Sequence, residues 1–222
     1  MKPRKVDIYD TTLRDGTQGE DFSLSVEDKL RIAQKLDTLG IPYIEGGWPG
    51  ATPRDTRFFK EVKDLPLEKA RIVAFGATRK ADNKVQEDGN LRALLQAGTE
   101  VVTLVGKSWD IHVTKVLGTT LKKNLDMISD SVGFLKSKKK TVFFDAEHYF
   151  DGFKENPEYA VQTLQAAWKA GADCVILCDT NGGTLPFDLQ EILGRTKREF
   201  TGPFGIHAHN DSDLAVANSL TA

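Results

Sequence analysis

The chain has 222 residues, of which 40% are hydrophobic, and its 30 basic and 32 acidic side chains leave a formal net charge of -2. This length supports one sizeable core and is short for two domains. The charge balance points to neither nucleic acid nor an anionic membrane, so a small-molecule ligand is the better expectation. The segment 1–5 has basic residues but passes into 6–10 without the apolar run of a secretory signal, and no apolar stretch approaches a membrane span. We therefore expect a cytoplasmic protein.

Short apolar runs alternate with amphipathic helical patterns along the chain, as in repeated strand–helix units around a parallel sheet. The predicted strands are 6–11, 43–46, 71–75, 101–105, 141–145, 174–178 and 204–209. Three junctions share one pattern, in which a helix closes on Gly40, Gly98 or Gly171 and the chain then enters a strand. Their spacing gives about 30 to 36 residues per unit, as in a TIM (β/α)8 barrel. An open doubly wound sheet is the competing architecture, but no Gly-x-Gly-x-x-Gly follows the first strand.

Two predicted helices carry clear boundary signals. The helix at 26–39 begins with a capping box of Ser25 and Asp28, and Gly40 ends it. Its buried face is predicted to carry Val26, Leu30, Ala33, Leu36 and Leu39. A second helix has an N-cap and a first-turn proline at Asn156–Pro157. Its predicted buried residues are Val161, Leu164, Ala167 and Trp168.

Two further features have a plain and a functional interpretation. The lysine-rich run 136–140 ends the fourth helix, where cations suit the negative end of the helix dipole. A solvated helix end is therefore favoured over a binding patch. Cys174 and Cys178 lie in one apolar segment, and two thiols cannot build a disulfide framework. We predict small buried residues rather than a pair of metal ligands.

The chain stops inside a helical pattern that begins at Asp213 and has no capping glycine or proline. A complete barrel takes about 250 residues and has an eighth strand, which this sequence lacks. We expect residues 1–222 to be one catalytic barrel domain, truncated after about seven strand–helix units and lacking the C-terminal domains of a longer enzyme. Unpaired edges on the first and seventh strands would then favour aggregation or pairing with another chain.

Polar residues gather where the first two predicted strands end, which is the rim at which barrels of this class hold their reacting groups. The first strand ends in the segment 10–18, which is dense in charged and hydrogen-bonding side chains. Taken alone, Arg14 and Asp15 fit a solvated turn as well as a site. Glu45 ends the second strand, where it extends the polar rim or serves as a salt-bridge partner for Arg14.

The histidines also cluster at predicted strand ends. His207 and His209 are two apart at the end of the seventh strand, so they are predicted to point to the same face. Two such imidazoles with one carboxylate suit a divalent cation that keeps open positions for water or substrate. His148 follows the fifth strand and His112 follows the fourth. Satisfied structural histidines are common, so the pair alone is weak evidence.

Acidic residues complete this predicted rim. Asp145 and Glu147 alternate at the end of the fifth strand and therefore share a face. The segment 179–183 extends the polar ring after the sixth strand. Layers inside such a barrel come from alternate strands, so strands 1, 5 and 7 can supply Asp15, Glu147 and the histidine pair at a common depth.

The segments 13–18 and 207–211, together with Glu45, resemble the metal-dependent acyl-CoA barrel superfamily. That superfamily includes the 2-isopropylmalate, homocitrate and citramalate synthases and 3-hydroxy-3-methylglutaryl-CoA lyase, and the resemblance spans essentially the whole chain. Three further segments are most similar to the citramalate synthase branch: 43–50, 107–113 and 145–152. Homocitrate synthases tend to carry glutamate where this chain has Asp15, which counts against that branch.

The resemblance implies roles for individual residues. It implies a divalent metal ion (Zn, Mn or Mg) bound by Asp15, His207 and His209. It implies that Arg14 stabilises the negative oxygen of a keto acid, that Glu147 handles the proton of an acetyl methyl group, and that Glu45 steadies the arginine. The implied substrate-binding residues are Arg14, Gln18, His112, Asp145 and Thr180, the last through the keto-acid carboxylate.

The implied activity is a Claisen condensation of acetyl-CoA with pyruvate, giving (R)-citramalate and CoA in isoleucine and branched-chain amino-acid biosynthesis. A homodimer is implied for the full-length enzyme. Related enzymes draw a general acid from a segment beyond the barrel, so the resemblance favours metal and pyruvate binding by these residues more than turnover. The alternatives are a 2-isopropylmalate synthase that accepts 2-oxoisovalerate, a carbon–carbon lyase, or a metal-binding barrel module without turnover. The intact set of charged residues counts against the last.

Overall fold

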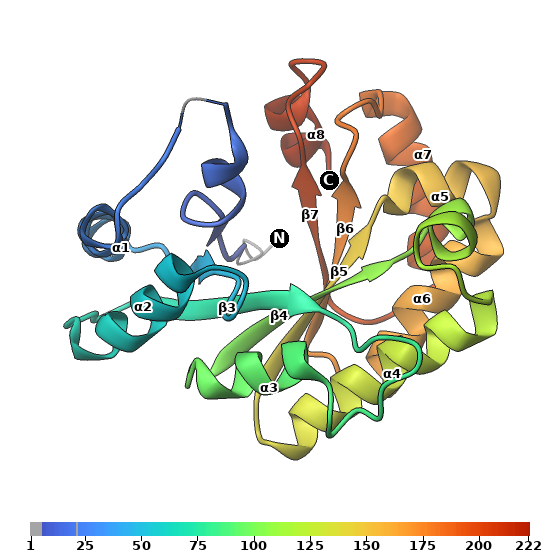
Figure 1. Ribbon diagram of the computed structural model, residues 1–222. Helices are drawn as coiled ribbons and strands as arrows, with labels where there is room; N and C mark the ends of the chain where they lie inside the picture. Colours follow the sequence, from blue (N-terminus) through green and yellow to red (C-terminus); the bar gives the residue numbers. More distant parts are fainter. Residues whose placement is uncertain (1–5, 21) are drawn as a thin grey trace. The chain divides into compact units, whose positions relative to one another are not determined.

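The computed structural model describes residues 6–20 and 22–222 and shows an α/β chain in which strands and helices alternate (Figure 1). The strands are β1 (Tyr9–Asp10), β2 (Tyr43–Gly47), β3 (Arg71–Ala77), β4 (Val101–Lys107), β5 (Thr141–Glu147), β6 (Cys174–Asp179) and β7 (Phe204–Ala208). The α-helices are α1 (Val26–Leu39), α2 (Pro53–Glu61), α3 (Gly89–Gln96), α4 (Leu121–Ser137), α5 (Tyr149–Glu155), α6 (Pro157–Lys169), α7 (Pro186–Glu199) and α8 (Ala215–Thr221). The basic residues 1–5 lie outside the described residues.

The strand order confirms the predicted fold class. In the described part of the chain the sheet runs from β1 to β7 in sequence order. The pairs β1–β2, β2–β3, β5–β6 and β6–β7 are parallel. Sequential parallel strands joined through helices are the pattern of a (β/α) barrel, whereas the order reverses at a switch point in a doubly wound sheet. None of the helices in the described ranges is long and apolar enough to cross a membrane.

The chain forms two compact units. The first runs up to Gly76 and resumes over Gly89–Thr103, so it contains β1, β2, β3 except its last residue Ala77, and helices α1 to α3. The second comprises Ala77–Asp88 and Leu104–Ala222 and contains β5 to β7 and helices α4 to α8. The strand β4 contributes residues to both.

Strand β1 is shorter than the predicted strand at 6–11. Only Tyr9 and Asp10 pair with β2, opposite Tyr43 and Ile44. This register places residue 8 opposite Pro42, which has no N–H to donate to a ladder, so pairing does not extend toward the N-terminus. Ile8 is correspondingly 58% exposed.

Helix α1 confirms the predicted boundaries but only part of the predicted buried face. The capping box of Ser25 and Asp28 is present, and Gly40 ends the helix in the left-handed region at φ 87°. Leu39 is 76% exposed, so its predicted burial is wrong. Lys29 and Asp37 are buried on this helix instead.

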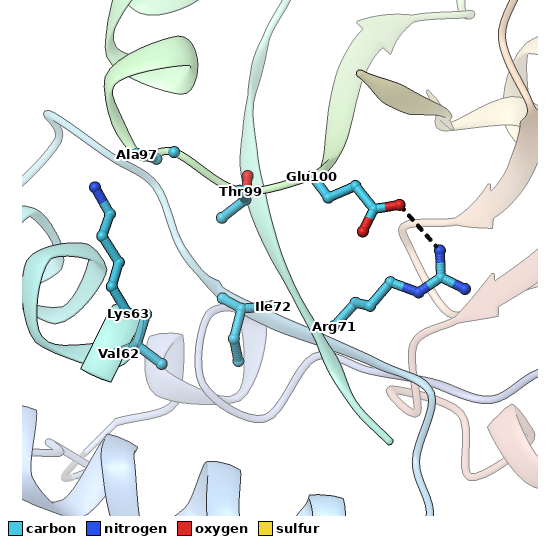
Figure 2. A pocket seen from close by; sticks show the side chains of 8 residues that line it. Val62, Lys63, Arg71, Ile72, Ala97, Thr99 and Glu100 are labelled. Atoms are coloured by element: carbon cyan, nitrogen blue, oxygen red, sulfur yellow. Dashed lines mark hydrogen bonds and ion pairs between the residues drawn. The ribbon is translucent and has the colours of Figure 1, made fainter. Parts of the chain in front are cut away.

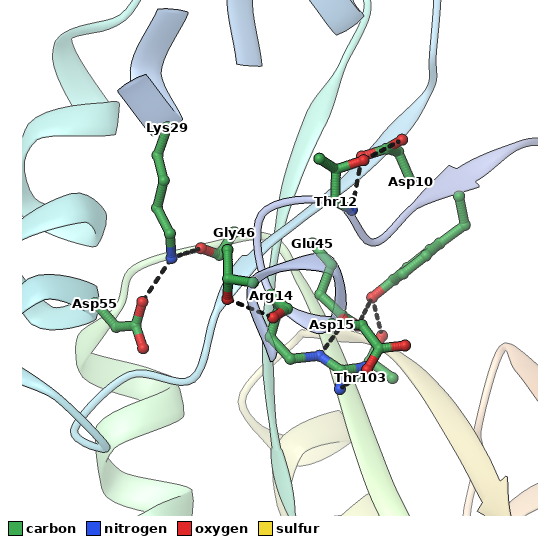
Figure 3. Close-up of polar contacts among 11 residues, drawn as sticks. Asp10, Thr12, Arg14, Asp15, Lys29, Glu45, Gly46, Asp55 and Thr103 are labelled. Carbon is green, nitrogen blue, oxygen red and sulfur yellow. Dashed lines mark hydrogen bonds and ion pairs between the residues drawn. The ribbon is translucent and has the colours of Figure 1, made fainter. Parts of the chain in front are cut away.

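Those two charged residues have partners that the helical pattern does not reveal. Lys29 Nζ pairs with Asp55 Oδ1 at 2.6 Å and donates to the Gly46 carbonyl at 3.0 Å (Figure 3). The carboxylate of Asp37 accepts three backbone N–H bonds, from residues 68, 69 and 70. These bonds lower the pKa of Asp37, the bond from residue 70 most. Both side chains therefore tie α1 to segments that follow it in the sequence.

In the second unit the strands β5, β6 and β7 run side by side, and helices α4 and α6 pack on one another and against β5 (Figure 1). Helix α6 confirms its predicted start, because Asn156 caps it and Pro157 occupies its first turn. Three of its four predicted core residues are buried: Val161, Leu164 and Ala167. Trp168 is 39% exposed, since it lies edge-on to Phe200 rather than inside the core, with ring centroids 6.0 Å apart.

The lysine-rich run and the cysteines follow the plainer predictions. Helix α4 ends at Ser137, and Lys136 pairs with Asp173 Oδ2 at 2.7 Å, so the run is a helix end. Cys178 is buried and Cys174 is partly buried, and neither forms a disulfide with a described residue. Burial raises the pKa of the Cys174 thiol to about 11.

Candidate active site

An arginine is fixed at the carboxyl end of β1. Arg14 Nε donates to Glu45 Oε1 at 2.5 Å, and Arg14 Nη1 lies 3.2 Å from Asp15 Oδ1 (Figure 3). The guanidinium carbon also lies 3.8 Å from the centroid of the Phe75 ring. The predicted salt bridge between Glu45 and Arg14 is therefore present. Ionic bonds and stacking on an aromatic face together hold a permanent positive charge in one orientation.

Glu45 is itself held from its other side. It is fully buried, and its Oε2 accepts a hydrogen bond of 2.5 Å from the Tyr9 hydroxyl. The same hydroxyl lies 2.8 Å from Thr103 Oγ1. Neither Tyr9 nor Thr103 could be recognised from the sequence, because both lie inside apolar strand patterns and carry no motif. Gln18, in the short 3-10 helix Asp15–Gln18, is exposed.

In the second unit, His207 and His209 converge as predicted. Their ring centroids are 5.0 Å apart and the ring planes are inclined by 36°. β7 ends at Ala208, so His209 follows the strand, yet its backbone N–H still donates to the Asp179 carbonyl at 3.2 Å. That bond continues the β6–β7 pairing by one step and keeps the two imidazoles on the same face. Histidine is the commonest metal ligand in proteins, and two imidazoles on one face suit a divalent ion.

The loop after β6 passes closely against His209. Gly182 adopts φ 59°, and an added Cβ there would lie 2.9 Å from the His209 carbonyl oxygen and 2.8 Å from Asp211 Oδ2. Asp179, which is 1% exposed, orders the same loop by accepting hydrogen bonds from the N–H and the hydroxyl of Thr184. Only glycine fits this left-handed position beside the histidine.

The acids of β5 have different surroundings. Asp145 is buried, and its carboxylate lies in a group with Cys178 and His207 whose ligand atoms are all within 4.8 Å of one another. Glu147 forms an ion pair with Lys107 at the end of β4, and each side chain is 24% exposed. Lys107 was not identified from the sequence, although it opens the segment 107–113 that supported the family resemblance.

Two histidines and a tryptophan form a cluster beyond the ends of β4 and β5. The ring centroid of His112 lies 4.5 Å from that of His148 and 4.8 Å from that of Trp109. Burial, and secondarily electrostatic interaction with His148 and Lys107, lower the pKa of His112. His112 Nδ1 is buried and has no hydrogen-bond partner within the described ranges. The neutral form of this imidazole is therefore favoured.

His148 connects this cluster to the predicted substrate residue Thr180. It has φ 54°, its backbone N–H donates to Thr180 Oγ1 at 2.9 Å, and its Nδ1 lies 3.1 Å from Asp151 Oδ2. The following helix α5 approaches β4 closely at Gly152. An added Cβ at Gly152 would collide with the Ser108 carbonyl oxygen. The end of β4 is thus packed directly against α5.

A pocket of about 240 Å³ lies elsewhere in the first unit (Figure 2). It is lined by Val62, Lys63, Arg71, Ile72, Ala97, Gly98, Thr99 and Glu100. Arg71 begins β3, and Glu100 directly precedes β4, so the pocket lies at the amino ends of these strands. In barrels of this class that end serves stability, while the carboxyl ends carry the chemistry. None of the predicted site residues lines it.

The comparisons with known proteins agree with the fold and with the resemblance. The family model described as HMGL-like matches residues 5–222. The (R)-citramalate synthase of Geobacter sulfurreducens is 57% identical over 217 residues, which cover 98% of this chain and 41% of that protein. The 2-isopropylmalate synthase of Methanocaldococcus jannaschii is 33% identical over 220 residues, which cover 99% of this chain and 40% of that protein.

Among solved structures, the HMG-CoA lyase of Bacillus subtilis superposes with a TM-score of 0.81 over 99% of this chain and 73% of that chain, at 21% identity. This likeness shows a shared fold. The chain spans less than half the length of the two curated synthases that it matches.

Proposed function

Because the chain belongs to the HMGL-like family, we propose that it is the catalytic barrel of an (R)-citramalate synthase, which joins acetyl-CoA, pyruvate and water into (R)-citramalate and CoA. The observation that carries the proposal is the convergence of His207 and His209 at a strand end, because paired imidazoles suit a metal-assisted condensation. Identity to the citramalate synthase of Geobacter sulfurreducens, well above that to the 2-isopropylmalate synthase, favours this branch.

We propose Asp15, His207 and His209 as the ligands of a divalent metal ion. Two imidazoles and one carboxylate fit Zn²⁺ and Mn²⁺, and they leave positions for a bidentate keto acid. A bound ion would supply Lewis-acid polarisation of the keto carbonyl. The 5.0 Å separation of the two imidazole centroids is compatible with one shared ion.

Arg14 would stabilise the alkoxide that develops on the keto oxygen. Its charge is permanent, and Glu45 and the Phe75 ring hold its guanidinium in place before substrate arrives. A charge that needs no reorganisation during the reaction is the most effective kind of transition-state stabiliser. Asp15 directly follows Arg14, so the proposed metal ligand and the arginine are neighbours in one segment.

Glu147 would accept a proton from the acetyl methyl group, and the resulting carbon nucleophile would attack the keto carbon. The Lys107 ammonium holds this carboxylate through an ion pair. Thr180 would contact the keto-acid carboxylate, and its hydroxyl oxygen is already oriented by the His148 N–H. Hydrolysis of the citramalyl thioester would then release CoA and make the condensation irreversible.

The substrate assignment is tested by CoA release from the full-length enzyme with pyruvate, 2-oxoisovalerate or 2-oxoglutarate as acceptor. We expect the highest kcat/KM with pyruvate. Preference for 2-oxoisovalerate would replace the proposal with a 2-isopropylmalate synthase. Metal binding without CoA release from any of the three acceptors would instead indicate a binding module.

The ligand set is tested separately by calorimetric titration with Mn²⁺. We expect Asp15→Ala and His209→Ala to weaken binding by more than about tenfold, the loss that even removal of an outer hydrogen bond can cause. His112→Ala is the matched control, because it removes an imidazole outside the proposed set. Equal affinity in wild type and His209→Ala would show that the ligands are wrong.

A further inference from the structure

A second group of metal-ligating side chains lies on the strands β5 to β7. Asp145, Cys178 and His207 each offer one ligand atom, and these atoms all lie within 4.8 Å of one another. Asp145 and Cys178 are each 6% exposed, and His207 is partly exposed. A carboxylate, a thiol and an imidazole thus meet in a largely buried position.

The sheet register explains why these three side chains meet. Asp145 of β5 is the partner of Ile176 in β6, and Cys178 of β6 is the partner of His207 in β7. Partners in a parallel pair project to one face, and Cys178 lies two residues after Ile176, so it shares that face. The group is therefore positioned by three hydrogen-bonded strands rather than by mobile loops.

The chemistry of the group differs from that of the proposed active-site set. A thiolate ligand selects soft or borderline ions such as Zn²⁺, Co²⁺ and Cd²⁺, whereas Mg²⁺ and Mn²⁺ prefer oxygen. Ligand atoms around a tetrahedral Zn²⁺ ion lie about 3.3 to 3.8 Å apart. Side-chain rotations that move the three ligand atoms by about 1 Å would therefore bring them all within bonding distance of one ion. Binding would release the thiol proton of Cys178 to solvent.

We propose that Asp145, Cys178 and His207 form a thiolate-containing site for a soft divalent cation, and that its occupation withdraws His207 from the set of Asp15, His207 and His209. Zn²⁺ would then inhibit the enzyme by redirecting one imidazole, while Mg²⁺ would not enter the site. The inhibitory part of this inference rests on the proposed function. The binding part rests only on the three side chains.

Cobalt titration tests the binding part without any substrate. A Co²⁺–thiolate bond gives charge-transfer absorption in the near ultraviolet, which oxygen and nitrogen ligands do not produce. We expect this band in the wild-type chain and its loss in Cys178→Ser and Cys178→Ala. Cys174→Ser is the matched control and should keep the band, because Cys174 lies on the same strand outside the group. Far-ultraviolet circular dichroism of each variant checks that it is folded.

A band that is absent in the wild type, or that persists in both Cys178 variants, would overturn the proposal. His209→Ala separates the two sites, since it should keep the cobalt band while losing Mn²⁺ affinity. In the full-length enzyme, Zn²⁺ should inhibit the wild type at lower concentration than Cys178→Ala, with each activity normalised to its zinc-free value. If Zn²⁺ inhibits both proteins equally while the wild type shows the cobalt band, only the withdrawal of His207 is refuted. A different preferred keto acid would overturn the proposed function and leave the cobalt result standing.

Discussion

Replacing Glu45 with glutamine tests whether a buried charge holds Arg14 in place. The substitution keeps the size of the side chain and removes its charge. Both carboxylate oxygens of the fully buried Glu45 accept hydrogen bonds of 2.5 Å, one from Arg14 Nε and one from the Tyr9 hydroxyl. A glutamine side chain keeps one acceptor oxygen for Arg14 Nε, and its NH2 group faces the Tyr9 hydroxyl, which must then accept a hydrogen bond instead of donating one.

The expected loss of stability follows from these contacts. Removing one partner of a buried ion pair typically costs about 3–5 kcal/mol. The side chain of Arg14 is 14% exposed and keeps its ion pair with Asp15 at 3.2 Å. We therefore expect the lower end of the range, about 3 kcal/mol. In a chain of this size, about 1 kcal/mol corresponds to about 2–4 °C, so Tm should fall by about 6–12 °C.

Tyr9→Phe is the matched control, because it removes a hydrogen bond to Glu45 and leaves the ion pair with Arg14 intact. Its expected cost is about 1 kcal/mol, or about 2–4 °C. Thermal and urea unfolding followed by circular dichroism measure both variants. A Tm for Glu45→Gln within about 2 °C of the wild type, or a loss no greater than that of Tyr9→Phe, would refute the reasoning.

Three further predictions concern other contacts. Lys29→Met leaves the Asp55 carboxylate, 12% exposed, without its ammonium partner and should lower the free energy of unfolding in urea by about 3 kcal/mol. Adding Asp55→Leu should restore most of this lost stability, because no unpaired charge then remains. A double variant as unstable as Lys29→Met would contradict the prediction. Gly152→Ala should lower the free energy of unfolding by about 1–3 kcal/mol, because the added Cβ has no room. In Gly133→Ala, inside α4, the added Cβ meets nothing within 4 Å, so the free energy of unfolding should rise by about 0.5–1 kcal/mol. Tm shifts of the same sign in the two variants would contradict this prediction. Folding lowers the pKa of His112 from 6.5, so the unfolded chain binds the imidazole proton more readily, and the free energy of unfolding should fall as the pH drops below 6.5. In His112→Gln the free energy of unfolding should therefore fall less than in the wild type between about pH 7.5 and about pH 5.5. An equal fall in both proteins would exclude this imidazole as the source.

The order of the elements and several contacts of the candidate site could be predicted from the amino-acid sequence. Local rules were enough for the helix at 26–39, because its capping box and Gly40 satisfy backbone groups within a few residues of the helix ends. Strand alternation was enough to predict that His207 and His209 converge, and their rings are 5.0 Å apart. The ion pair of Arg14 with Glu45 was one of two interpretations of adjacent strand ends, and it is present.

Which charged side chains are buried, and which apolar side chains are exposed, depends on tertiary contacts. Lys29 is buried because Asp55 and the Gly46 carbonyl satisfy it, while Leu39 of the same helix is exposed. Lys107 meets Glu147 across 40 positions of sequence. Cys178 was predicted to be a small buried residue, and the sheet register places it beside Asp145 and His207. Helix caps and strand periodicity act over a few residues, but burial and pairing depend on partners that only folding brings together.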